Sequence, residues 1–478
     1  MIFTLSDIQT NNLEDLKQNI QTAIDKDKID ARHTYIKQGT DYYINNTDIL
    51  SAQKTYFDEN GAEVTDPTRA NNKVTHSFYP LLVKQKVGYL LGKPINFASE
   101  DKNVNDYLKS ILGAKWDMTA QELLKNASNK GDEWLYCYID RAGEFTYTVC
   151  PTEQIIPLYD NAFKTNLDGV IRYYDTTNLA GDIVKHWEFW TREKVMYFTD
   201  TELVGESAHF LINGKGYSFG ELPFIQFRNN AEMTTDLSLV KDLIDNYDKV
   251  VSGLANDLDD IQDSILILKG YQGTDPAEFN KNLKFFKLIK VDDTGDVNKL
   301  EIKIPVDAKD SHLSRLEDDI YRLGMGVDVS AEKLGNSSGV ALKFIYSLLD
   351  LKSDMSEAQF RQGITHFLKV ISNWYGTIYG TPFERDTVKV TFNRSFIVNT
   401  KEQIVNCVNS VGLISAETML ANHPFVQDVD YEKERIEEEG INPAWLNQEA
   451  KATNTSNEFT SQDTTEPYEH TGETPENE

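Results

Sequence analysis

Residues 236–268 read DLSLVKDLIDNYDKVVSGLANDLDDIQDSILIL. Apolar residues recur there in steps of three and four, a 3.5-residue repeat that predicts one helix with an apolar seam, about 48 Å long. The seam consists of Leu237, Val240, Ile244, Tyr247, Val251, Leu254, Leu258 and Ile261, continued by Ile265 and Leu268. The only other helical segment of this kind, Leu313–Leu323, is short, so we expect neighbouring copies of the chain to complete the burial of the seam.

The other side of this helix is acidic, with aspartates from Asp242 to Asp263. The run NDLDDIQD resembles the carboxylate clusters of two-metal nucleases. That chemistry needs carboxylates that converge from separate elements, whereas these lie on one helix beside the seam. The sequence therefore favours a charged helix face over a metal site.

Length, net charge and cysteine content limit the classes of function that this chain can have. The chain has 478 residues, enough for two to four domains, and a net charge of -28 from 48 basic and 76 acidic residues. Nucleic-acid binding by Lys and Arg is disfavoured by this acidity. Three separated cysteines indicate a reducing compartment, and we expect neither a signal peptide nor a membrane span.

Other secondary-structure patterns lie on both sides of the predicted seam helix. Residues 6–38 read as a helical arm, 57–73 as a loop, and Ser77–Gly92 as an apolar helix that Gly92 ends. Short alternating runs such as WLYCYID and KHWEFWT fill 134–227 and predict an antiparallel sheet. A long helix follows from Val340 to about Tyr375, and 400–449 is helical again. We expect the acidic tail after 451 to be disordered.

A Gly/Ser-rich loop, SAEKLGNSSGVALKF (330–344), precedes the long helix. A phosphate cradle would need a strand before the loop and a Gly-Lys-Ser/Thr ending, but Val340 and Ala341 occupy those positions. A flexible segment is favoured, with Ser337 or Ser338 as the helix cap.

A basic run, NKNLKFFKLIK, stands out in this acidic chain. Its lysines, interleaved with apolar residues, are Lys281, Lys284, Lys287 and Lys290. An ordinary amphipathic element is the default interpretation, and a docking face for an acidic partner is the more specific hypothesis.

No catalytic constellation is present. The eight histidines are scattered without metal-ligand spacing, and no nucleophile motif appears. We therefore expect no enzyme activity, no metal and no cofactor.

The order of these parts resembles the portal proteins of tailed double-stranded-DNA bacteriophages, in the branch of long-tailed phages (siphophages) of Gram-positive hosts. The stretches that carry the resemblance span most of 70–395 and are GYLLGKPINF, IIPLYD, LPFIQFRNN, DLSLVKDLIDNYDKVVSGLANDLDDI and GVDVSAEKLGNSSGVALKFIYSLLDLK. The resemblance implies an α+β portal fold with a mixed α/β wing, a long-helix stem, a small α/β clip and a helical crown, assembled as a ring.

Carried over by position, the resemblance divides the chain into nine parts. They are an N-terminal arm and loop (1–70), wing (71–233), stem helix (234–268), clip (269–307), second stem helix (308–326), tunnel loop (327–339), long wing helix and strand (340–399), crown (400–450) and acidic tail (451–478).

The resemblance also implies a function and partners. The protein would be made in the host cytoplasm and would form a ring, a dodecamer in the virion, at one capsid vertex. Double-stranded DNA would pass through this ring during packaging and ejection. Implied partners are the terminase large subunit, a head-completion adaptor, and the major capsid and scaffolding proteins. The strong negative charge suits a conduit that passes DNA without gripping it.

Site residues follow from the same correspondence. The tunnel loop that contacts DNA would contain Lys333, Gly335, Asn336, Ser337, Ser338 and Gly339, and Lys281, Lys284, Lys287 and Lys290 would dock partners in the clip. Lys333 would contact phosphate, or else be solvated or paired with an acid of a neighbouring subunit.

Two other classes remain open from the residues alone. An acidic coiled-coil scaffold or head-morphogenesis protein is disfavoured by the strand-rich 130–230 region. A terminase-like motor or nuclease is disfavoured by the missing nucleotide loop.

Overall fold

The computed structural model describes residues 2–67, 69–199, 202–261, 265–269, 296–300, 305–328, 339–395, 400–426 and 429–440. The chain divides into two compact units, Met1–Ile397 and Val398–Glu478, and each is described by itself.

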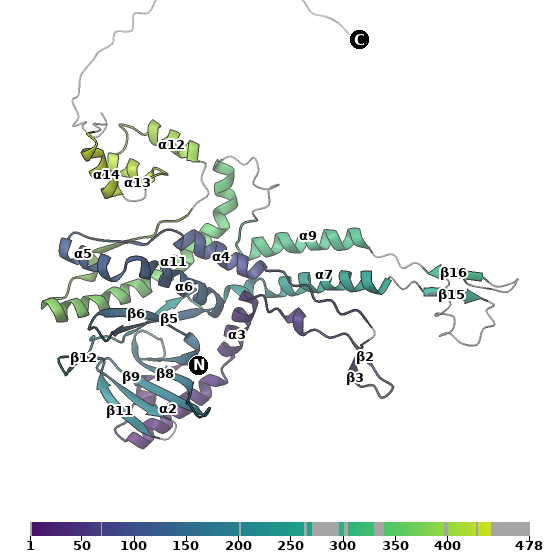
Figure 1. The fold of residues 1–478 in the computed structure, drawn as a ribbon, viewed down its shortest axis with the longest axis horizontal. Coiled ribbons are helices and arrows are strands. Elements are labelled where there is room, and N and C mark those ends of the chain that lie inside the picture. The colour runs from purple at the N-terminus through teal and green to yellow at the C-terminus, as the bar shows by residue number, and fades with distance from the viewer. Residues whose placement is uncertain are drawn as a thin grey trace, which may run out of the picture. The chain divides into compact units, whose positions relative to one another are not determined.

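Two sheets form the body of the first unit (Figure 1). The six-stranded sheet has the order β1-β7-β8-β9-β10-β11, and the three-stranded sheet has the order β14-β5-β6. All neighbours pair antiparallel except β1 and β7, which are parallel. The strands of the larger sheet are β1 (Phe3–Thr4), β7 (Ile155–Tyr159), β8 (Leu167–Thr177), β9 (Ile183–Trp190), β10 (Lys194–Thr199) and β11 (Leu203–Ala208), and those of the smaller are β14 (Phe224–Arg228), β5 (Asp132–Ile139) and β6 (Phe145–Cys150). The antiparallel sheet structure predicted over 134–227 is therefore confirmed.

A shared core joins the two sheets. Trp134 and Phe224 from the smaller sheet pack with Val170 and Trp190 from the larger one. The opposite face of the larger sheet is covered by helix α2 (Leu13–Lys28), whose Leu16, Ile20 and Ile24 face inward at helical spacing.

A helical layer covers the smaller sheet. It contains α4 (Phe78–Leu91), α5 (Lys102–Ile111), α6 (Gly113–Lys130) and the 41-residue α11 (Gly339–Tyr379). Trp116 of α6 stacks on Phe367 of α11, with ring centroids 5.0 Å apart, at the centre of the largest apolar cluster. The predicted apolar helix ending at Gly92 and the long helix from Val340 are both confirmed.

One two-stranded sheet pairs residues 265–269 with residues 296–300. Three further two-stranded sheets lie in the described part of this unit. Their strands are β12 (Phe210–Ile212) with β13 (Lys215–Tyr217), β4 (Asn96–Ser99) with β17 (Val388–Thr391), and β2 (Thr55–Phe57) with β3 (Glu63–Thr65). Short 3₁₀ helices complete it: η1 (Asp48–Ser51), η2 (Thr152–Gln154), η3 (Asp236–Leu239) and η4 (Arg385–Thr387).

The N-terminal region differs from the sequence prediction. The arm is three helices, α1 (Leu5–Ile8), α2 and α3 (Ala31–Tyr43), and the predicted loop holds the β2–β3 hairpin. The helix breaks follow from local capping: Asn12 accepts the N–H of Glu14 and Asp30 accepts the N–H of Arg32. Such short polar side chains compete with helix continuation.

The prediction of one continuous stem helix over 234–268 is wrong. Helix α7 covers Lys241–Ile261, Leu237 lies in η3, and Ile265 and Leu268 lie in β15 (Ile265–Lys269), which pairs with β16 (Asp296–Leu300). Two causes are visible. Val240 has non-helical backbone angles (φ −132°) after η3, and the last turn of α7 has acids and no basic residue, which opposes the helix dipole.

The helix expected over 308–326 is present as α9 (Val306–Leu323). The smaller unit contains α12 (Thr400–Asn409), α13 (Ala416–Asn422) and α14 (Val429–Glu438), consistent with the helical pattern expected there. Buried Cys407, Met419 and Leu420 lie in this unit. The tail after 451 lies outside the described residues.

Candidate functional site

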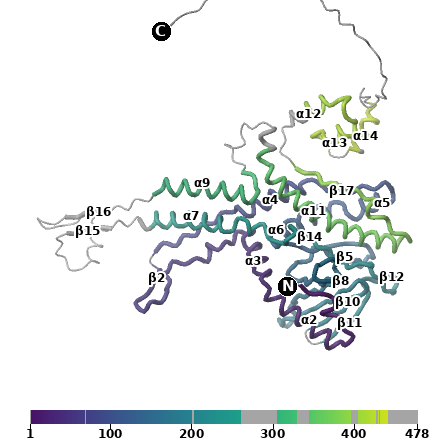
Figure 2. Tube along the Cα trace, turned by 180° about the vertical axis from the view of Figure 1, so that it is seen from behind, coloured from purple at the N-terminus to yellow at the C-terminus, as the bar shows by residue number. Residues whose placement is uncertain are grey.

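Helices α7 and α9 run side by side and project from the body (Figures 1 and 2). At their base, Leu237, Val240 and Ile244 pack against Ile320 of α9. Helix α4 closes this cluster with Tyr79, Leu82 and Val83. The base of the predicted seam is thus buried within one chain.

Farther from the body the seam loses cover. Tyr247 still packs edge-on against Phe78, with ring centroids 5.0 Å apart. Val251 and Leu254 are half-buried, and Leu258 is 55% exposed. The side chain of Ile261 lies outside the described part. The outer half of α7 therefore presents apolar surface that the described residues do not cover.

A polar ladder occupies another face of α7. The side chains of Asp248, Ser252 and Asn256 accept backbone N–H groups of the segment 72–76 at 3.1, 2.9 and 2.6 Å. The donors are every second residue, His76, Val74 and Asn72. Two residues of extended chain and four residues of helix each span about 6 Å, so the two repeats match.

The ladder covers one acid on the polar side of α7. Asp248 is buried, and it also accepts from the Nδ1 of His76 at 2.8 Å and the hydroxyl of Thr47 at 3.0 Å. Burial raises the pKa of the Asp248 carboxyl above its ordinary value, and the hydrogen bonds from His76 and Thr47 oppose that rise. Asp242 and Asp259, by contrast, are exposed.

At the root of the stem lies a buried ionic cluster. The carboxylate of Asp236 lies 3.2 Å from the ammonium of Lys86 on α4 and 3.1 Å from that of Lys352 on α11. Asn229 donates to the same carboxylate at 2.8 Å and accepts from Lys86 at 2.5 Å. Four buried polar side chains thus tie the stem root, α4 and α11 together. We call Lys86, Asn229, Asp236 and Lys352 the root cluster.

The root cluster is strongly coupled electrostatically. Burial alone would raise the pKa of Asp236, but Lys352 and Lys86 hold it well below its ordinary value. Burial lowers the pKa of Lys86 to about 8, against the opposing attraction of Asp236. Removing Asp236 would leave two buried ammonium groups without their carboxylate, which is costly in a protein interior.

The chain leaving α9 is clamped to the same region. Lys352 donates to the carbonyl of Gly324 at 3.0 Å. Gln85 of α4 binds both backbone groups of the buried Val327, accepting its N–H at 2.9 Å and donating to its carbonyl at 2.6 Å. Any loop between α9 and α11 therefore begins after Val327.

Comparison with known proteins gives the family. The sequence model of the family described as "Phage portal protein, SPP1 Gp6-like" matches residues 23–442. The chain belongs to this portal family. Membership makes it a structural component of the phage particle.

Two curated relatives agree with this assignment. The portal protein of Bacillus phage SPP1 is 34% identical over 449 residues, covering 91% of this chain and 89% of the relative. The portal protein of Clostridium phage phiCD119 is 36% identical over 454 residues, covering 90% and 97%. Both come from phages of Gram-positive hosts, which confirms the resemblance seen in the sequence.

A solved structure, the neck of a native GTA particle computed with C12 symmetry, also matches. Its TM-score is 0.40 at 11% identity, over 73% of this chain and 89% of that one. A likeness at this level carries no argument about this portal protein.

Most predicted clip and tunnel-loop residues of the portal protein lie outside the described residues. These are the four clip lysines, Lys281, Lys284, Lys287 and Lys290, and the loop residues Lys333, Gly335, Asn336, Ser337 and Ser338. Gly339 is the first residue of α11. Their roles stay predictions.

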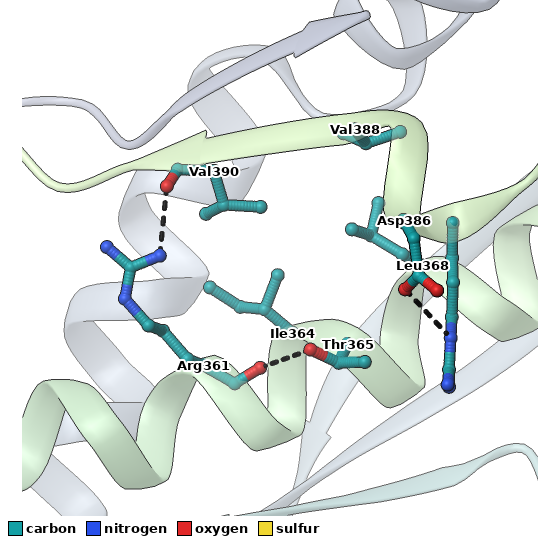
Figure 3. Close-up of a pocket in the computed structure, with 8 residues that line it drawn as sticks. Arg361, Ile364, Thr365, Leu368, Asp386, Val388 and Val390 are labelled. Atoms are coloured by element: carbon teal, nitrogen blue, oxygen red, sulfur yellow. Dashed lines mark hydrogen bonds and ion pairs between the residues drawn. The ribbon is translucent and has the colours of Figure 1, made fainter.

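Two grooves lie on nearly opposite faces of α11. Since each helical residue advances by about 100°, their lining residues are about 160° apart around the helix axis. One of them, about 260 Å³, lies between α11 and β17 (Figure 3). Its floor is apolar, from Ile364, Leu368, Val388 and Val390. Each arginine at its rim is paired with a carboxylate: Arg361 donates to Glu357, and Arg385 lies 3.4 Å from Asp386. This groove offers no unpaired charge to a ligand.

The sequence analysis missed the root cluster. A signal was present in Lys86, which stands in the middle of an apolar helix where a lysine must find a buried partner. Its partner could not be read from the sequence, because Asp236 and Lys352 are 150 and 266 positions away.

The described part contains neither a candidate metal site nor a candidate membrane span. No group of three His, Cys, Asp or Glu there could hold a metal ion. No described helix has an apolar stretch sufficient to cross a bilayer.

Proposed function

We propose that this portal protein is the subunit of a ring at one capsid vertex, through which double-stranded DNA is packaged and later ejected. The observation that carries the proposal is the family match over 23–442, with 34% and 36% identity to two portal proteins. The ring is a dodecamer in the virion.

The stem supports assembly. Leu258 is exposed and Val251 and Leu254 are only half-buried along a helix that α9 covers at its base. Burying such apolar surface is favourable at roughly 25 cal/mol per Å². The neighbouring copy in the ring covers this outer seam.

The charge supports a conduit. Each copy has a net charge of -28, so the ring repels the phosphate backbone and lets DNA of any sequence slide. Within the segment 327–339, the loop residues Lys333 to Gly339 face the passing DNA, and Lys333 contacts phosphate.

The clip supplies the partner contacts. Lys281, Lys284, Lys287 and Lys290 dock the terminase large subunit during packaging and the head-completion adaptor afterwards. The major capsid and scaffolding proteins surround the ring at the vertex. The chain has no catalytic role of its own.

Electron microscopy of the purified protein tests the ring. We expect closed rings with an axial hole. Well-folded monomers across a wide concentration range, measured by light scattering, would contradict the proposal.

Two sets of variants test the assigned regions. Reversing the four clip lysines is expected to weaken terminase binding in a low-salt pull-down while rings persist. Lys333→Glu is expected to leave assembly intact and impair packaging, because it adds a ring of negative charge along the DNA path. Normal DNA packaging by the Lys333→Glu variant would show that Lys333 does not contact the passing DNA.

A further inference from the structure

The smaller unit has little core of its own. Its described helices α12, α13 and α14 (Figure 1) are 10, 7 and 10 residues long, and isolated helices of this length are marginal in water. Among the side chains described there, three are buried, those of Cys407, Met419 and Leu420. A folded unit of roughly 40 residues commonly gains stability by association with another protein surface.

An exposed apolar surface lies along α12 and the turn that follows it. On α12, Cys407 is buried, while Val405 and Val408 lie one turn apart and about 130° away from it around the helix axis. In the turn, Leu413 is 83% exposed. Five exposed apolar residues within ten positions are typical of an interaction site. We call them the α12 patch: Val405, Val408, Val411, Leu413 and Ile414.

The turn holds this patch in a fixed conformation. The N–H of Leu413 donates to the carbonyl of Ser410 at 3.0 Å. Gly412 has a left-handed backbone (φ +81°), which glycine adopts without strain. Val411 and Ile414 are joined by a β-bridge. A preorganised surface of this kind loses little conformational entropy when a partner docks.

A second exposed apolar group lies beyond the other end of α13. Phe425 is 71% exposed. The N–H of Val426 donates to the carbonyl of His423 at 3.1 Å, and the imidazole of His423 meets the Phe425 ring edge-on, with centroids 5.6 Å apart. Because the α12 patch precedes α13 and Phe425 follows it, the unit presents one exposed apolar surface at each end of this helix.

The geometry of a ring makes a second copy of this chain the matching partner. The portal family implies an oligomeric ring. In a ring, the same head-to-tail contact repeats around the axis and joins two different surfaces of each subunit. The α12 patch and Phe425 are two such surfaces, and both are apolar. Each can therefore cover the other in the next copy.

We propose that the smaller units of neighbouring copies pack head to tail, with Phe425 of one copy seated on the α12 patch of the next. This inference rests on the proposed ring. An aromatic side chain buried in an aliphatic site is a common anchor of protein interfaces. Because the contact is apolar, it resists added salt, unlike an ion pair at the surface.

Disulfide trapping in the full chain tests the contact. Rings of the variant Leu413→Cys/Phe425→Cys are isolated by sedimentation and oxidised. We expect a ladder of covalently linked subunits, from dimers upward, on a gel without reductant, because each copy is then bonded to both neighbours. The native cysteines are buried and should stay unreactive. The control Leu413→Cys/Leu211→Cys, with an exposed leucine of β12, should give a several-fold weaker ladder.

The outcomes separate this contact from the ring itself. Rings that give no ladder would overturn the head-to-tail contact and leave the ring proposal standing. Chains that carry only an internal disulfide would show that Phe425 reaches the α12 patch of its own copy, which would also overturn it. Covalent dimers formed equally well by Leu413→Cys alone would show a symmetric contact instead. If no rings form, both proposals fail.

Amide hydrogen exchange provides a second readout. In isolated rings, Leu413→Asp should speed exchange several-fold in peptides that cover 404–426, because a charge on the patch expels Phe425 of the next copy. The substitution costs a lone unit little, since Leu413 is exposed there. Ring yield should be unchanged, because the stem is intact, and Leu211→Asp should exchange like the parent. Exchange at the parent's rate in Leu413→Asp rings would exclude the α12 patch from the contact.

Discussion

The ammonium of Lys352 lies 3.1 Å from the carboxylate of Asp236, and both side chains are buried. The same ammonium donates to the carbonyl of Gly324 at 3.0 Å. One lysine of α11 thus links the root of α7 to the end of α9. The two stem helices and the long helix are held in one arrangement by this contact.

The root cluster predicts a large stability effect. Asp236→Asn leaves Lys86 and Lys352 buried without their carboxylate, so we expect a loss of about 3–5 kcal/mol in the free energy of unfolding. Guanidinium denaturation followed by tryptophan fluorescence measures it. Glu206→Gln is the control, because Glu206 and Lys194 form an exposed pair worth about 0–1 kcal/mol. Equal effects of the two variants would show that the cluster contributes little.

Glu133 predicts a pH dependence. Burial raises the pKa of the Glu133 carboxyl to about 7, although Lys130 opposes the rise. The folded chain therefore holds this proton where the unfolded chain, near the ordinary 4.5, has lost it. Its contribution to stability is complete below pH 4.5 and is lost as the pH rises through 7.

Denaturation midpoints at pH 5 and pH 8 check this dependence. Glu133→Gln should reduce the decline between the two values, since one pKa unit corresponds to about 1.4 kcal/mol. If the stability of the Glu133→Gln variant falls between pH 5 and pH 8 as steeply as that of the parent, other groups cause the pH dependence.

The polar ladder predicts local protection of a backbone amide. Ser252→Ala removes the acceptor of the Val74 N–H, and an unsatisfied buried donor costs about 1–3 kcal/mol. We expect faster amide hydrogen exchange in peptides that cover 72–76. Ser347→Ala, at an exposed serine on α11, should leave that exchange unchanged.

Two helical glycines predict opposite effects. A Cβ at Gly363 would lie 2.7 Å from the ring of Phe227, so Gly363→Ala should destabilise the fold by about 1–3 kcal/mol. A Cβ at Gly253 would meet nothing within 4 Å, so Gly253→Ala should stabilise α7 by about 0.5–1 kcal/mol. Thermal unfolding of the two variants tests the difference in sign.

The exposed seam predicts weaker assembly on a charge substitution. Leu258→Asp places a charge on the outer seam, where we propose that a neighbouring copy packs. Sedimentation should show fewer rings and more free subunits. Leu179→Asp, on the exposed turn between β8 and β9, is the matched control. Unchanged ring yield for Leu258→Asp would exclude this part of α7 from the interface.

Local patterns in the sequence determined much of the secondary structure and the family. The alternating runs over 134–227 became strands, because side-chain periodicity acts between near neighbours. The apolar helix ends before Gly92 as expected, although Gly92 keeps right-handed backbone angles (φ −69°). The stretches that resemble portal proteins led to the family that the comparison then showed.

Only the tertiary structure decided where the stem helix ends and which polar residues are buried. The apolar spacing continues through Ile265 and Leu268, but these residues pair in a sheet with β16, a partner about 30 positions away. Likewise Asp248 belongs to the same acidic pattern as Asp259, yet the segment 72–76 covers the first and leaves the second exposed. Periodicity reports which residues share a face, whereas burial depends on which distant segment reaches that face. Contacts between residues more than 100 positions apart have no local signature, so the root cluster appears only once the chain has folded.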